Sequence, residues 1–210
     1  TGSFLSFNTG TKPHASIAGI VPIIAWKIGA EIVYTAEGQS QDTATIIDWC
    51  RAVDLFQDYD ELEEIVTSIP NTDDLYFVPA FSGIQVYMLS IVYKTIVAFL
   101  FCFPEKAPVN DESVAAGYVG IKPSTTKAHL LRAAVESLAF RIYQLCQLMY
   151  EETGKAVVEI RVDGGVCQND FLMQLVADLT MATIERPTCV ETTVQGAAIM
   201  AGVQAGNVPN

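Results

Sequence analysis

The chain has 210 residues, of which 50% are hydrophobic and 17% are charged, and its formal net charge at pH 7 is −12. This length is enough for one large or two small domains with a buried core, and the composition excludes a disordered chain. A surface this acidic repels nucleic-acid phosphates and anionic lipid headgroups, which argues against nucleic-acid binding and against a membrane-surface role. A bound nucleotide would therefore need local groups, such as backbone amides, to hold its phosphates.

The cysteines are widely spaced and odd in number, and no two form a Cys-x-x-Cys pair. They are Cys50, Cys102, Cys146, Cys167 and Cys189. This pattern predicts neither a disulfide framework nor a zinc site, favours a reducing compartment, and leads us to expect a cytoplasmic protein. His14 and His129 lie far apart among residues that do not bind metals, so we expect no metal site and no catalytic Cys–His pair.

The chain begins without Met and without a signal peptide, and Thr1–Asn8 is already strand-like. We therefore expect a fragment of a longer protein. The first third alternates strands and turns, and its short turns predict an antiparallel meander. The expected strands are Ser3–Phe7, one or two strands over Ala15–Trp26 around Pro22, and Glu31–Tyr34.

Helical periodicity then predicts Thr43–Val53 and a short acidic helix over Asp60–Ser68, followed by a buried strand over Leu75–Phe81. In the last third, Pro123–Thr126 supplies the N-cap signal of a long helix that runs to about Glu152. A β-α-β-α order follows, which predicts an α/β domain with helices on a mixed sheet. Its elements are Val157–Val162, Phe171–Thr180 capped by Asn169 or Asp170, Thr183–Arg186 and Val194–Ala205.

The clearest chemical signal is the end of the strand Val157–Val162, where Asp163, Gly164 and Gly165 follow and a helix begins a few residues later. Two glycines allow a ligand to approach the backbone closely, and a helix N-terminus offers unpaired amides. The pattern suits a nucleotide site, although a tight connection without a ligand has the same pattern.

Two further segments can be interpreted either as purely structural or as functional. Thr1-Gly2-Ser3-Phe4 leads into a hairpin and could hold a phosphate through its amides, or could be an ordinary turn. A short strand over Ala116–Ile121 precedes an amphipathic helix that contains His129 and Glu136, and core packing explains both side chains equally well.

Together these segments resemble the C-terminal lobe of the FGGY carbohydrate kinase family, and within it the glycerol kinases. The helix segment matches the family's C-terminal signature at Gly120, His129, Ala133 and Glu136. Other matching segments are Thr1–Gly10 (second phosphate segment), Leu75–Gly83 (the run before the closing motifs), Arg161–Asn169 (adenosine segment) and Gln195–Ala198 (closing helix). The resemblance covers nearly the whole chain except about Val86–Glu105.

The resemblance implies an actin-like ATPase lobe of the ribonuclease-H-like type. It also implies transfer of the γ-phosphoryl group of ATP, with Mg²⁺, to a hydroxyl of glycerol or a similar small polyol, with xylulose or gluconate as alternatives. Phe4 would form an apolar wall beside the substrate. The implied cofactor-binding residues are Thr1, Gly2, Ala44, Asp48, Gly164, Gly165 and Asn169.

Three departures from the family pattern qualify these implications. The family's catalytic aspartate and most substrate contacts belong to an N-terminal lobe upstream of Thr1, so we expect the isolated chain to be inactive. Ala44 and Asp48 stand where Gly and Gln are usual. Ala107–Asp111 resembles a divergent branch of the glycerol kinases. A non-catalytic nucleotide-binding or interaction variant therefore stays open, and the missing lobe and a homo-oligomer are the protein partners to consider.

Within the segment Val86–Glu105, the stretch Val86–Phe103 is almost wholly apolar and is interrupted by Lys94. It has nearly the length of a membrane span, but the central lysine and the position between two matched motifs argue against one. Because the motif order resumes on either side, we hypothesise that a translated intron forms this segment. A genuine loop or an apolar partner-binding helix is the alternative.

Overall fold

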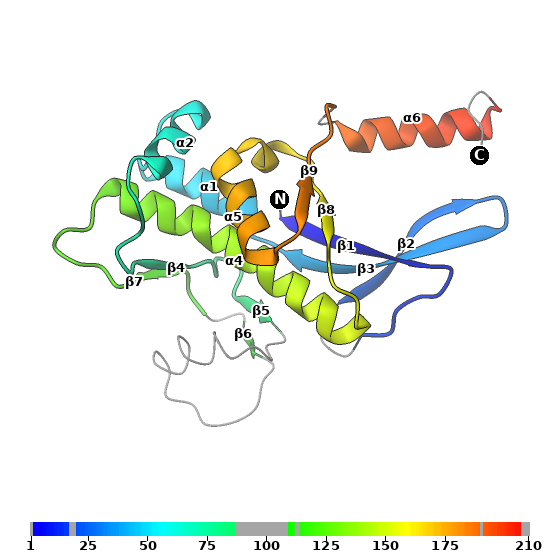
Figure 1. The fold of residues 1–210 in the computed structure, drawn as a ribbon, viewed down its shortest axis with the longest axis horizontal. Helices are drawn as coiled ribbons and strands as arrows, with labels where there is room; N and C mark the ends of the chain where they lie inside the picture. Colours follow the sequence, from blue (N-terminus) through cyan, green and yellow to red (C-terminus); the bar gives the residue numbers. More distant parts are fainter. Residues whose placement is uncertain (1, 17–19, 87–108, 112–113, 190, 207–210) are drawn as a thin grey trace.

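Figure 1 shows the computed structural model of the chain, which describes residues 2–16, 20–86, 109–111, 114–189 and 191–206. Antiparallel strands come first, and helices alternate with short strands after them. The elements are β1 (Ser3–Gly10), β2 (Val21–Ile28), β3 (Glu31–Ser40), α1 (Thr43–Ala52), α2 (Tyr59–Thr67), β4 (Tyr76–Val78), β5 (Ile84–Val86), β6 (Val109–Asp111), β7 (Gly117–Val119), α4 (Lys127–Thr153), β8 (Glu159–Arg161), the 3₁₀ helix η1 (Gly165–Gln168), α5 (Asp170–Thr180), β9 (Thr183–Glu185) and α6 (Thr192–Gln204).

The first sheet has the strand order β1-β3-β2, and both of its pairings are antiparallel. The expected meander was wrong in this respect, because β2 pairs with β3 and not with β1. The expected strand Glu31–Tyr34 was also too short. β3 continues to Ser40, since its second half pairs with the first half of β1 from Ser3 onward. Pro22 lies on the edge strand β2, where a missing amide proton is tolerated.

The long helix α4 forms the centre of the molecule and confirms the predicted helix from Thr126 to about Glu152. Thr126 is its N-cap, and the Thr126 backbone N–H donates to the Nδ1 atom of His129. Buried apolar residues of α4 join those of α1, α2 and α5 in one core cluster. The largest fully buried side chains there include Leu131, Val135, Leu172 and Val176.

The signature residue Glu136 also has a structural partner. It accepts a hydrogen bond from the Arg132 Nε at 2.7 Å, while the Arg132 Nη1 donates to the carbonyl oxygens of Val66 and Ile69 at the end of α2. The Arg132 guanidinium also lies 4.7 Å from the centre of the Phe171 ring on α5. The helix segment of the family signature therefore holds three helices together.

Aromatic side chains connect α1 to the two-stranded sheet of β4 and β7. The rings of Phe77 and Tyr118 lie 4.8 Å apart, and Trp49 stacks on Phe77 at 5.9 Å. Only part of the predicted strand Leu75–Phe81 pairs with β7. Phe77 is buried and Tyr76 is exposed, so only one face of the paired part is covered. Burial in this cluster also raises the pKa of the Tyr118 phenol.

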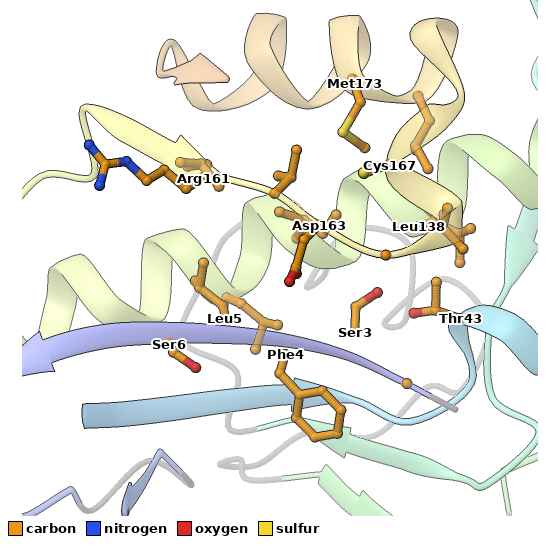
Figure 2. Close-up of a pocket in the computed structure, with 18 of the residues that line it drawn as sticks. Ser3, Phe4, Leu5, Ser6, Thr43, Leu138, Arg161, Asp163, Cys167 and Met173 are labelled. Carbon is orange, nitrogen blue, oxygen red and sulfur yellow. The ribbon is translucent and has the colours of Figure 1, made fainter. Parts of the chain in front are cut away.

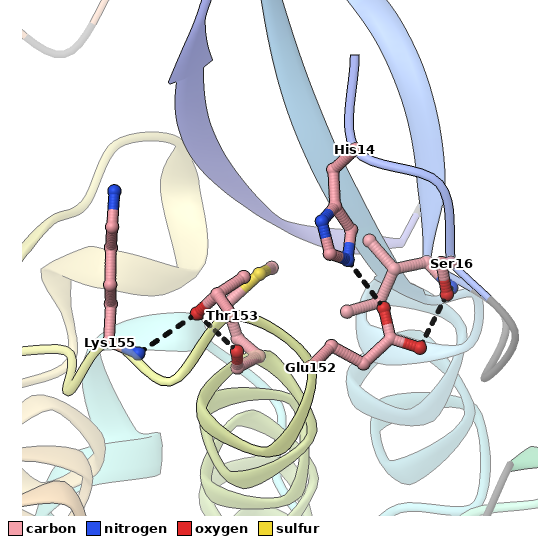
Figure 3. A network of polar contacts seen from close by, with 7 residues as sticks. His14, Ser16, Glu152, Thr153 and Lys155 are labelled. Carbon is pink, nitrogen blue, oxygen red and sulfur yellow. Dashed lines mark hydrogen bonds and ion pairs between the residues drawn. The ribbon is translucent and has the colours of Figure 1, made fainter. Parts of the chain in front are cut away.

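The linker between β1 and β2 is tied to the C-terminal end of α4, as Figure 3 shows. The carboxylate of Glu152 lies 2.8 Å from the Nε2 atom of His14 and accepts a hydrogen bond from the Ser16 hydroxyl at 2.6 Å. These contacts join residues far apart in the sequence, and they fix the first sheet against the helix that underlies it.

The predicted β-α-β-α tail is present, and with it the α/β class. β8 and β9 pair in parallel, with η1 and α5 between them in the sequence. In the described residues the sheet is divided into a three-stranded ladder and three two-stranded ladders. α6 has no buried residues and projects away from the other elements in Figure 1.

β5 and β6 form an antiparallel pair that the sequence did not predict, with Val86 opposite Val109. The hypothesis about Val86–Glu105 concerns a segment that, from residue 87 on, lies outside the described residues. The pairing places the two strands that flank this segment, β5 before it and β6 after it, side by side. Within the described ranges, no helix has the length and apolarity needed to cross a membrane.

Candidate nucleotide site

A cavity of about 1080 Å³ lies between β1 and the segment that contains β8 (Figure 2). Segments from several parts of the chain line it, with helix α4 on the apolar side. The lining includes Gly2–Phe7 from β1, Thr43 and Ala44 from α1, Leu138, Ile142, Leu145 and Met149 from α4, and Ala156–Gln168 from β8 and the turn that follows it.

The glycine pair at the end of β8 leaves open space beside this cavity. Gly164 has a φ of +88°, a region that favours glycine, and a Cβ atom added at Gly164 or Gly165 would meet nothing within 4 Å. At Gly2, by contrast, an added Cβ would lie 2.3 Å from the Ser40 carbonyl oxygen. Packing therefore explains Gly2, whereas Gly165 has no packing reason to be glycine, and a ligand can approach its backbone.

Polar side chains enter the cavity from both walls. Figure 2 shows the Asp163 carboxylate directed from the end of β8 toward β1, with the hydroxyls of Ser3 and Thr43 on the opposite side. The hydroxyl of Thr192, at the start of α6, donates to the Asp163 carboxylate and so ties α6 to this turn. A carboxylate, hydroxyls and open backbone together suit a ligand with polar and charged groups.

The structure brings five of the predicted site residues to this cavity: Gly2, Phe4, Ala44, Gly164 and Gly165. Phe4 is 58% exposed, and in Figure 2 its ring lies on the other side of β1 from Leu5. Its ring is thus free to contact a molecule placed on that side. Thr1 lies outside the described residues.

Two other predicted site residues do not belong to the described lining. The Asp48 carboxylate accepts a hydrogen bond from the Tyr59 hydroxyl at 2.8 Å, which raises the pKa of that phenol. Asn169, one of the two expected caps, is the N-cap of α5, and its side-chain oxygen accepts a hydrogen bond from the Leu172 N–H at 2.8 Å.

Sequence reasoning missed several lining residues, chiefly Asp163, Thr43 and Cys167. The signal for Asp163 was its position directly before the two glycines, and that for Thr43 was its place as the first residue of α1. Cys167 is 4% exposed; burial raises the pKa of its thiol, and the positive charge of Arg186 opposes this rise. A protonated, buried thiol is a packing group and a poor nucleophile.

The described part of the chain contains no group of three or more His, Cys, Asp or Glu side chains that could hold a metal ion. Asp163, Glu159 and Glu191 are carboxylates that line the cavity, but they do not form such a group. A metal ion at this position would need most of its ligands from a bound molecule and from water.

Comparison with known proteins gives a consistent result. The sequence model of the C-terminal domain of the FGGY family of carbohydrate kinases matches residues 1–205. The chain is 45% identical over 206 residues to glycerol kinase 5 of Danio rerio, an alignment that covers 98% of this chain and 35% of that protein. The crystal structure of Plasmodium falciparum glycerol kinase with ADP matches with a TM-score of 0.80 and 28% identity, over 97% of this chain and 37% of that one.

A xylulose kinase from Lactobacillus acidophilus matches with a TM-score of 0.72 and 18% identity, over 100% of this chain and 38% of that one, and so shares the fold. The fold is therefore that of an actin-like ATPase lobe. The chain belongs to the FGGY family of carbohydrate kinases as a C-terminal domain similar to that of glycerol kinases. It spans little more than a third of the length of these relatives.

Proposed function

We propose that this chain is the ATP-binding lobe of a kinase that transfers the γ-phosphoryl group of ATP to a hydroxyl of glycerol or a similar small polyol. The observation that carries the proposal is the cavity between β1 and β8, beside which Gly164 and Gly165 leave the backbone open. Support comes from the matching crystal structure of Plasmodium falciparum glycerol kinase with ADP.

The residues of the chain suit the parts of an adenine nucleotide. The open backbone at Gly165 accommodates a flat or bulky group, and apolar side chains of α4, together with Ile160 of β8, line the cavity. Ser3 and Thr43 offer hydroxyl donors to phosphate oxygens on the opposite wall. Phosphoryl transfer depends mainly on such positioning and on charge stabilisation, since little covalent chemistry is required of the protein.

Magnesium belongs to the proposal as the counter-ion of the ATP phosphates. Mg²⁺ in nucleotide sites is usually bound by one or two carboxylates together with phosphates and water, and Asp163 is a carboxylate in a suitable place. Bound magnesium neutralises charge on the phosphates. We also propose a cytoplasmic location, in keeping with the widely spaced cysteines.

In this proposal, residues 1–210 form one FGGY lobe that contains an atypical apolar insert at about 86–105. An N-terminal lobe would supply the base that accepts the proton of the substrate hydroxyl. We therefore expect the 210-residue chain alone to bind ATP and ADP in a calorimetric titration and to release no ADP from ATP with glycerol. A folded chain that binds neither nucleotide would refute the proposal.

The substrate is tested in a protein in which this chain follows an N-terminal kinase lobe. We expect ADP release with glycerol to exceed ADP release with xylulose or gluconate. Faster release with either sugar compound would assign the chain to a related sugar kinase.

One observation favours a second candidate, a nucleotide-binding variant without turnover. Ala44 and Asp48 replace the Gly and Gln of other glycerol kinases, and Tyr59 occupies the Asp48 carboxylate. In that case the two-lobed protein would bind ADP in calorimetry. It would produce no ADP from ATP with glycerol, xylulose or gluconate.

A further inference from the structure

Arg186, directly after β9, contacts the segment that follows the two glycines at three points. Its Nη1 atom donates to the carbonyl oxygens of Cys167 at 3.2 Å and of Gln168 at 3.4 Å. Its Nη2 atom lies 2.5 Å from the Oδ1 atom of Asp170. One side chain thus joins the end of η1 and the start of α5 to the parallel pair β8–β9.

The charge of Arg186 suits both partners. The carbonyls of Cys167 and Gln168 are at the C-terminal end of η1, where helix carbonyls lack partners and carry partial negative charge. Asp170 is the first residue of α5, and its own N–H donates to the Glu63 carboxylate of α2 at 3.1 Å. The segment is therefore fixed from β9 on one side and from α2 on the other.

These contacts act on the nucleotide site through the backbone. A peptide group is planar, so fixing two successive carbonyls fixes the orientation of the peptide planes around Gln168. The turn Asp163–Gly165 is tied at its other end by the Thr192 hydroxyl. Between these two anchors lie Gly164 and Gly165, where no packing contact meets an added Cβ. The backbone conformation at Gly164 and Gly165 thus depends on the contacts that hold the residues before and after them.

We propose that Arg186 is a positioning residue, which holds the segment Gly164–Gln168 in the conformation that binds the nucleotide. This inference rests on the proposed function of the site. Arg186 itself is not among the described lining residues of the cavity, so it acts through the segment and not by contact with the ligand. Its fork-shaped guanidinium reaches all three oxygens, which a lysine ammonium could not do from one position.

The test compares Arg186→Met with Arg186→Lys, and with Lys122→Met as the matched control. Lys122 is also a partly exposed cation with two carboxylate partners, Asp73 at 3.0 Å and Asp74 at 3.4 Å, and it does not line the cavity. Because charge-assisted hydrogen bonds are lost, we expect Arg186→Met to weaken ADP binding about tenfold in calorimetry. Arg186→Lys should recover part of this loss, and Lys122→Met should bind ADP as the unmodified chain does.

A second readout separates positioning from general stability. Amide hydrogen exchange of residues 165–170 should accelerate in Arg186→Met, while exchange in α4 stays as it is in the unmodified chain. In a two-lobed protein, the KM for ATP should rise and the KM for glycerol should not. Asp170→Asn removes the negative charge from one of the three contacts and should weaken ADP binding less than Arg186→Met does.

The outcomes distinguish the two proposals. No ADP binding by the unmodified chain refutes the proposed function, and this inference with it. Normal ADP binding by a folded Arg186→Met chain refutes the inference alone. If Arg186→Met does not fold, Arg186→Lys decides the matter, since binding as tight as that of the unmodified chain overturns the proposal.

Discussion

Two glycine turns of this molecule have similar positive φ angles and opposite surroundings. Gly120, between β7 and α4, has a φ of +94°, and Gly164, after β8, has a φ of +88°. A Cβ atom at Gly120 would lie 2.3 Å from the Asp74 carbonyl oxygen, whereas one at Gly164 or Gly165 would meet no atom within 4 Å. Close packing requires glycine at the first turn. At the second the space is open, and it adjoins the cavity that we assign to the nucleotide.

The largest expected effect is on stability and belongs to the Gly120 turn. Gly120→Ala places a methyl group against backbone that cannot move aside and forces a left-handed conformation on alanine. We expect a loss of about 3 kcal/mol in the free energy of unfolding, measured by urea denaturation. Gly117→Ala is the control, because an added Cβ at Gly117 meets nothing within 4 Å and should change stability little. Equal losses in both variants would contradict the comparison.

The next effect is on binding and belongs to the open turn. Gly165→Val adds a branched side chain where the nucleotide approaches the backbone, and we expect ADP binding to weaken at least about tenfold in calorimetry. The free energy of unfolding should change by less than about 1 kcal/mol, because no packed atom is displaced.

The control for this variant is Gly117→Val, which adds the same side chain at an open glycine that does not line the cavity. It should leave ADP binding as it is in the unmodified chain. If Gly165→Val binds ADP normally, the open space at this turn is not part of a nucleotide site.

The comparison also indicates which features the sequence could predict. The long helix from Thr126 was correct, and Asn169 is one of the two caps expected for α5, because these signals are local and lie within a few residues. The family resemblance was correct too, since it depends on the order of short motifs. The length of β3 was missed because pairing with β1 and β2, and not local propensity, determines where that strand ends.

The site was predictable in part for the same reason. Gly164 and Gly165 were found because a strand, two glycines and a helix follow one another in the sequence. The positions of Asp48 and Asn169 outside the described lining depend on partners, Tyr59 and the amide of Leu172, that only the folded chain brings close. Arg186 could not be assigned from the sequence, because its three contacts join the end of β9 to the end of η1 and the start of α5, 16 to 19 residues earlier in the chain.

The smallest expected effect is the pH dependence of stability that comes from a buried thiol in the packed core. Cys50 is fully buried in the core cluster around α1 and α4, and burial raises the pKa of its thiol to about 12 from an ordinary value of 9.0. Between these two values the unfolded chain loses the proton and the folded chain keeps it. The unfolded state therefore binds fewer protons, and the stability that is fully present below pH 9 falls as the pH rises.

For Cys50 alone this loss reaches about 1 kcal/mol at pH 10, and the variant Cys50→Ala lacks it. Urea denaturation of both proteins from pH 7 to pH 10.5 measures the difference. Cys50→Ala should be the less stable protein at neutral pH, because it leaves a small void in a packed core. The gap between the two proteins should be constant from pH 7 to pH 8 and should narrow above pH 9. A gap that stays constant up to pH 10.5 would mean that water reaches Cys50, so that the core around α1 is as open as the turn at Gly165.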